Sequence, residues 1–85
     1  MLQAAYPNPF NSILTIPFGL PRAGEVSIVL SDLSGRMVEW VIKRESYSAG
    51  MHRIGIDLGD HPTGVYLLRL QWNNEIRTQK VVLIK

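Results

Sequence analysis

The chain of 85 residues contains no cysteine. Neither a disulfide framework nor a thiolate-bound metal can therefore hold a domain of this size together, and an apolar core has to do so. No apolar run reaches the roughly 18 residues of a membrane-spanning helix, and no basic and then apolar segment opens the chain as a signal peptide would. If the domain is exported, we expect the signal peptide to belong to a larger parent protein.

Charge is sparse as well. Nine Lys and Arg residues stand against seven Asp and Glu residues, and the basic residues are spread along the chain rather than clustered. A nucleic-acid-binding protein gathers such residues on one face, so we expect no nucleic-acid partner. The hydrophobic fraction of 46% and the charged fraction of 19% indicate one folded globular domain.

Apolar and polar residues alternate with a period of two along most of the chain, and no helical period occurs. The pattern predicts six strands, at residues 13–18, 25–31, 37–43, 51–58, around Tyr66 and at 75–85, and it leaves room for a short seventh at 44–48. We therefore predict an all-β fold, an immunoglobulin-like antiparallel β-sandwich of about seven strands. It would occupy residues 6–85, and residues 1–5 would be the end of a linker.

The turn that ends at Gly64 organises this pattern. The ring of Pro62 fixes its own φ angle, and Gly64 can adopt a positive φ at no steric cost. Two residues later, Tyr66 stands where a β-sandwich places a tyrosine corner, with its ring in the core and its hydroxyl bonded to upstream backbone. We predict that Gly35 takes a left-handed conformation in an earlier turn, and that Pro17 lies in an edge strand or beside a bulge.

The two tryptophans have different expected positions. Trp40 alternates with Val38 and Ile42, which predicts a core residue. Trp72 stands beside a turn at a strand end and is the better candidate for an exposed ring that could stack on a sugar.

The sequence offers only weak candidates for catalytic or metal-binding residues. His52 and His61 lie in different segments, and no nucleophile-elbow pattern surrounds any serine, so we expect no enzyme and no catalytic residue. Asp57 and Asp60 could offer oxygen ligands to Ca²⁺, but the EF-hand spacing is absent, and turn carboxylates usually bond to their own backbone. We expect no cofactor and no metal.

The last strand allows two interpretations. Residues 76–84 are largely apolar, and Arg77, Lys80 and Lys85 lie at its polar positions. It can be a closing strand whose charges keep a sheet edge soluble, or a terminal signal that another protein recognises, for example by strand addition. An exposed edge at the first or last strand would also permit weak homodimers.

Five motifs and a terminal lysine segment occur in the order in which one family carries them. They are Tyr6-Pro7-Asn8-Pro9-Phe10-Asn11, Leu20-Pro21-x-Ala23-Gly24, Asp32-x-x-Gly35-Arg36-x-Val38, Ala49-Gly50-x-His52, Pro62-x-Gly64-Val65-Tyr66-x-x-Arg69-Leu70 and Lys80-Val81-Val82 to Lys85. Taken together, the chain resembles the C-terminal sorting domain, type A, of the type IX secretion system. That family overlaps with the immunoglobulin-like domain of the flagellar hook-capping protein.

The resemblance implies a secretion signal at the C-terminus of a larger cargo from a Bacteroidetes-related bacterium. The cargo would cross the periplasm, pass the outer-membrane translocon and end at the cell surface or in the medium, and a sortase-like protease would usually remove the domain. The implied motif residues are Pro7, Asn8, Pro9, Asp32, Gly35, Arg36, Gly64, Tyr66, Lys80 and Lys85. An alternative is an immunoglobulin-like structural or adhesive module, or a carbohydrate-binding accessory module, of an extracellular bacterial protein.

Overall fold

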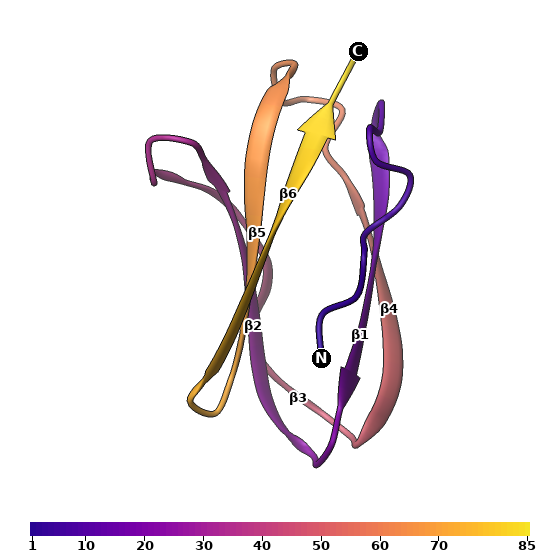
Figure 1. Cartoon of the computed structure of the whole chain (residues 1–85), viewed down its shortest axis with the longest axis vertical. Coiled ribbons are helices and arrows are strands. Elements are labelled where there is room, and N and C mark those ends of the chain that lie inside the picture. The colour runs from indigo at the N-terminus through magenta and orange to yellow at the C-terminus, as the bar shows by residue number, and fades with distance from the viewer.

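The computed structural model describes all 85 residues and contains six strands in two sheets. The strands are β1 (Ile13–Leu20), β2 (Gly24–Asp32), β3 (Met37–Tyr47), β4 (Gly50–Asp57), β5 (Gly64–Trp72) and β6 (Glu75–Leu83). One sheet pairs β1 with β4, and the other has the order β3-β2-β5-β6, with every pair antiparallel (Figure 1). The predicted all-β sandwich is confirmed. No helix that could span a membrane is present.

The core lies between the two sheets and is built by the predicted alternation. On β2, for example, Val26, Ile28 and Leu30 are fully buried, because every second side chain of a strand points to the same face. Three other strands contribute in the same way, with Leu14, Ile16 and Phe18 from β1, Leu68 and Leu70 from β5, and Val81 and Leu83 from β6. The inward side chains of β4, Ile54 and Ile56, are only partly buried against this core. Burial of these side chains is the main stabilising contribution, in the absence of any cysteine.

The strand count is six rather than about seven, because the predicted seventh strand is the end of β3. That strand continues to Tyr47 instead of stopping at Lys43. Its course is interrupted at Arg44, which has a φ of 53° and donates its backbone N–H to the Ser27 hydroxyl at 3.3 Å. Pairing with β2 resumes directly afterwards, at Glu45. The polar stretch after Lys43 is thus a local irregularity within β3, and β3 keeps β2 as its partner strand on both sides of it.

The predicted positions of the two tryptophans are both wrong. The register between β2 and β3 shifts, so that Ile28 pairs with Ile42 but the next residue, Val29, pairs with Trp40. The extra residue between Trp40 and Ile42 is a β-bulge, and it moves Trp40 to the outer face of the sheet, where it is 37% exposed. Trp72 pairs with Val26 on the inner face and is only 5% exposed.

Residues 1–10 form an arm that joins the two sheets. Its first part lies along β1, where the Gln3 N–H bonds to the Pro17 carbonyl at 3.0 Å and Tyr6 pairs with Thr15. Further on it reaches β6, where Phe10 pairs in parallel with Leu83 (Figure 1). The backbone of Pro17 faces the arm, on the side of β1 that is away from β4. Its missing N–H therefore leaves no gap in the hydrogen bonds between β1 and β4. The prediction that Pro17 lies in an edge strand is confirmed.

Candidate functional site

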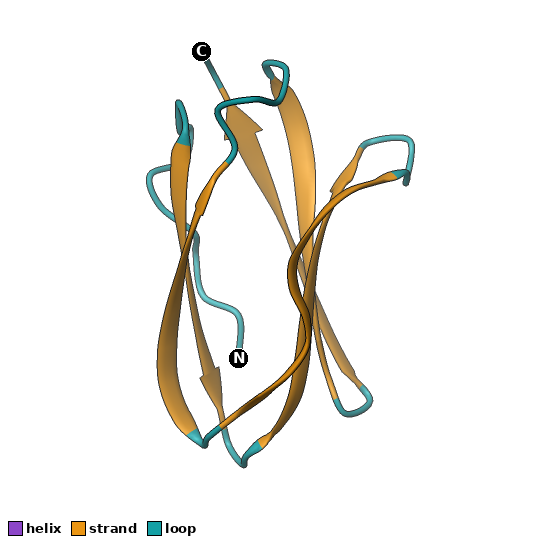
Figure 2. Cartoon of the chain, turned by 180° about the vertical axis from the view of Figure 1, so that it is seen from behind, coloured by secondary structure: helices purple, strands orange, loops and turns teal.

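The motif residues from four distant parts of the sequence lie at one end of the sandwich. The C-terminus is at the same end as the β2–β3 turn, the β4–β5 connection and the start of β1 (Figure 2). The Lys85 backbone N–H donates to the Thr63 hydroxyl at 3.1 Å, which ties the last residue to the turn before Gly64. A hollow of about 370 Å³ separates this turn from the β2–β3 turn, and Asp32, Arg36 and Tyr66 help to line it.

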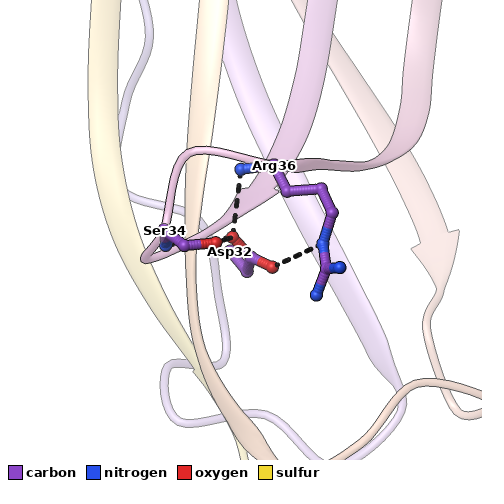
Figure 3. A network of polar contacts seen from close by, with 3 residues as sticks. All are labelled: Asp32, Ser34 and Arg36. Atoms are coloured by element: carbon purple, nitrogen blue, oxygen red, sulfur yellow. Dashed lines mark hydrogen bonds and ion pairs between the residues drawn. The ribbon is translucent and has the colours of Figure 1, made fainter.

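The Asp32 carboxylate organises the β2–β3 turn (Figure 3). It accepts the backbone N–H groups of Ser34 and Arg36 at 3.0 and 3.1 Å, the Ser34 hydroxyl at 2.6 Å, and the Arg36 Nε at 3.3 Å. These donors stabilise the charged form, and the Ser34 hydroxyl contributes most to holding the pKa of Asp32 below its ordinary value. Gly35 has a φ of 89°, as predicted. The arrangement builds a hairpin turn and uses the carboxylate internally.

Tyr66 forms the predicted tyrosine corner. Its ring is buried, and its hydroxyl donates to the Pro62 carbonyl at 2.5 Å. Gly64 differs from expectation, because it is not among the residues with a positive φ. A side chain at this position would meet the Tyr66 ring at an ordinary contact distance of 3.9 Å. The corner therefore depends on Pro62 and Tyr66, and Gly64 is an ordinary strand start.

Both backbone edges of β6 are occupied at residues 80–84. One edge pairs with β5, and the other is covered by Asn8 and Phe10 of the arm. The Asn8 carboxamide bonds to the Lys80 carbonyl at 3.2 Å and to the Val82 N–H at 3.0 Å. Phe10 donates to the Val82 carbonyl at 2.9 Å and accepts the Ile84 N–H at 2.8 Å. We call these four hydrogen bonds the clasp.

The clasp closes the expected open edge of the last strand over residues 80–84 only, and β6 stays the outermost strand of its sheet. A partner strand cannot pair with residues 80–84 until Asn8 and Phe10 have left, because their hydrogen bonds occupy the same backbone groups. The Val81 and Leu83 side chains are buried, whereas Lys80 and Lys85 are exposed and belong to no ion pair. The two ammonium groups and the half-exposed Ile84 side chain are thus the parts of this segment that a partner can reach without unfolding it.

The histidines and the aspartate that were considered for catalysis or metal binding make ordinary structural contacts. His52 stacks on Phe18 and bonds to the Ser48 carbonyl at 2.8 Å, while His61 bonds to Glu39 at 3.1 Å. The Asp57 carboxylate accepts the Gly59 N–H at 2.9 Å, the turn contact expected of it, and no three metal-ligating side chains meet anywhere in the chain.

The clasp could not be predicted from the sequence. The Pro7-Asn8-Pro9 motif marked the segment, but local spacing carries no information about which distant strand an asparagine side chain will bond to.

Two comparisons with known proteins bear on this arrangement. The family model described as the secretion system C-terminal sorting domain matches residues 4–85. No curated protein matches the chain.

Proposed function

The chain belongs to the secretion system C-terminal sorting domain family, and on that premise we propose how the secretion machinery recognises it. It is a sorting signal of the type IX system rather than an enzyme, and it directs the secretion of the cargo that carries it. Our proposal is that the outer-membrane translocon binds the exposed ammonium groups of Lys80 and Lys85 at the end of β6.

The clasp is the observation that supports this proposal. Since the backbone of residues 80–84 is hydrogen-bonded on both sides, recognition by simple strand addition would first have to break four hydrogen bonds. Binding of the two lysine side chains needs no such opening. An acidic surface on the translocon would attract them, and a lysine ammonium can donate up to three hydrogen bonds.

Removal of the domain would take place at the arm. We propose that the sortase-like protease of the system cleaves before Pro7, near Gln3 and Ala4, which are exposed. Cleavage there would leave the clasp and the buried core residues in place, and it would release Met1 and Leu2, which pack against that core. The route through the periplasm to the cell surface or the medium, and membership of the type A subgroup that is related to the hook-capping domain, belong to the same proposal. The order of the five motifs supports that membership.

An export assay tests the role of the lysines. Residues 1–85 are fused to the C-terminus of a fluorescent reporter that carries an inner-membrane signal peptide, in a host with a type IX system. We expect the natural sequence to reach the surface or the medium, and the Lys80→Ala/Lys85→Ala double variant to remain in the periplasm. Arg77→Ala is the control for loss of an exposed positive charge from β6, although Arg77 differs from the two lysines in being paired with Glu75 at 3.5 Å.

Point substitutions are preferable to deletion of residues 79–85. The deletion removes the buried Val81 and Leu83 side chains, so it would unfold the domain and block export for that reason alone. The double variant should keep the melting temperature of the natural domain, and lysine-to-arginine replacement should keep export. Full export of a folded double variant would contradict recognition at these lysines, whereas failure of the natural fusion to leave the periplasm would contradict the sorting function itself.

A further inference from the structure

The outer face of the four-stranded sheet carries a groove that the sorting role does not use. The register aligns Trp40 of β3, Val29 of β2 and Arg69 of β5 in one row across the sheet. Val29 is only 8% exposed although it points away from the core, because its neighbours rise on either side of it. Trp40 and Arg69 thus form two walls, with Val29 as the floor between them.

The groove continues along the strands on both sides of this row. A hollow of about 410 Å³ lies toward Arg44, Ser27 and Gln71, and a second of about 390 Å³ lies toward Met37 and Leu67. Trp40, Val29 and Arg69 line both hollows. The site is therefore elongated and suits a linear ligand rather than a compact one.

The charge of the groove is positive and unpaired. Arg44 and Arg69 belong to no ion pair, and the Lys43 Nζ lies 5.7 Å from the centre of the Trp40 ring. Glu25 is the one carboxylate in the lining. Three cations around one exposed indole attract an anionic ligand, and a guanidinium can hold a carboxylate with two parallel hydrogen bonds.

We propose that this groove binds an acidic oligosaccharide, with a sugar ring stacked on Trp40 and a carboxylate held by Arg69 and Arg44. Ser27 and Gln71 supply the hydroxyl and amide groups that suit sugar hydroxyls. An acidic peptide suits the groove less well. The floor belongs to β2 and β5, which are paired on both edges and offer no free backbone groups for strand addition.

The two tryptophans allow a direct test by NMR. Tetragalacturonate is titrated into the ¹⁵N-labelled chain, and the two indole N–H signals are followed. The Trp40 signal should shift, and the signal of the buried Trp72 should not, which provides an internal reference. Maltotetraose, a neutral chain of the same length, should shift neither signal.

Variants then test the two walls of the groove. Arg69→Gln should weaken tetragalacturonate binding by about tenfold, since it removes a charge-assisted hydrogen bond. Arg77→Gln removes the same charge from β6 outside the groove and should change binding by less than about twofold. Trp40→Ala should abolish measurable binding. Raising the ionic strength from about 0.05 to 0.5 M should also weaken binding.

Three results would overturn the proposal. One is the absence of any Trp40 shift at about 10 mM tetragalacturonate, a concentration that would reveal even very weak binding. Another is equal loss of binding in Arg69→Gln and Arg77→Gln, which would show general attraction to a basic protein. The third is binding of hexaglutamate as tight as that of tetragalacturonate, which would identify the groove as a site for acidic peptides. None of these results depends on whether the domain directs export.

Discussion

The Asn8 side-chain oxygen accepts the Val82 backbone N–H at 3.0 Å, although the two residues are 74 positions apart in the chain. Through the same carboxamide, Asn8 also donates to the Lys80 carbonyl. One side chain thus takes the place of a neighbouring strand at the edge of β6. The segment at the start of the domain and the segment proposed to be recognised are held by the same contact.

Replacement of Asn8 by alanine should loosen the end of β6. Loss of two hydrogen bonds should lower the free energy of unfolding by about 1–2 kcal/mol and speed hydrogen exchange of the Val82 amide. Asn11→Ala is the control, because Asn11 is exposed and its side chain makes no hydrogen bond. Urea denaturation and amide exchange measured by NMR provide the two readouts. Unchanged exchange at Val82 would show that the carboxamide does not hold the strand.

The tyrosine corner predicts two separate effects at one position. Tyr66→Phe removes the hydrogen bond to Pro62 but keeps the ring, and should cost about 1 kcal/mol of unfolding free energy. Tyr66→Ala also empties a buried site and should cost about 3–5 kcal/mol. Tyr6→Phe removes a hydroxyl from a half-exposed ring and should have almost no effect. Equal stability of Tyr66→Ala and Tyr66→Phe in urea would place the ring outside the core.

Asp32 should contribute a pH-dependent part of the stability. Its pKa is lowered in the folded state, chiefly by the Ser34 hydroxyl, from an ordinary value of 3.8. Its contribution is therefore present above pH 3.8 and disappears as the pH falls through the lower folded pKa. Asp32→Asn should be less stable than the natural chain at neutral pH, and the difference should vanish in strong acid.

Urea denaturation over a pH series measures that difference. Asp60→Asn serves as the control, since the Asp60 carboxylate is exposed and makes no hydrogen bond. A gap between natural and Asp32→Asn chains that stays constant down to strong acid would contradict a role for the ionised carboxylate.

Two glycines in strands should respond oppositely to alanine. A β-carbon at Gly24 would lie 2.6 Å from the Trp72 Nε1 and 3.2 Å from its Cδ1, so the buried indole would have to move. Such overpacking should cost about 1–3 kcal/mol and change the near-ultraviolet circular dichroism of Trp72. A β-carbon at Gly55 meets no atom within 4 Å, and the residue lacks a positive φ. Gly55→Ala should thus be neutral or stabilising by up to about 1 kcal/mol.

A similar loss of stability in both glycine variants, measured by urea denaturation, would contradict this assignment. It would show that glycine is needed for backbone freedom in these strands, and not for the space that Trp72 takes at Gly24.

Sequence patterns predicted those parts of the fold that local geometry determines. Alternation placed Val26, Ile28 and Leu30 correctly, because a regular strand turns every second side chain to one face. The Tyr66 corner and the positive φ of Gly35 were also predictable, since each depends on residues only a few positions away.

The misplacement of Trp40 and the missed contact of Asn8 share one cause, which is that the partner of a segment is not encoded in its spacing. The error at Trp72 is different, because its burial follows the local alternation of Tyr66, Leu68 and Leu70 along β5. The bulge between Trp40 and Ile42 arises from the pairing of β3 with β2, and one extra residue was enough to reverse the expected face of Trp40. Likewise, Asn8 meets β6 only after the arm has crossed from one sheet to the other. The groove on the outer sheet face and the clasp both depend on such pairings, and neither could be predicted.

The parallel pairing of Phe10 with Leu83 also decides how the domain bears mechanical force. A pull on the segment before Pro7, opposed by a pull at Lys85, slides two parallel segments along each other. The bonds of the clasp then share the load instead of rupturing one after another. Single-molecule stretching between residues 1 and 85 should need more force for the natural chain than for Asn8→Ala. A domain towed through a pore by its last residues would stay folded under tension for the same reason.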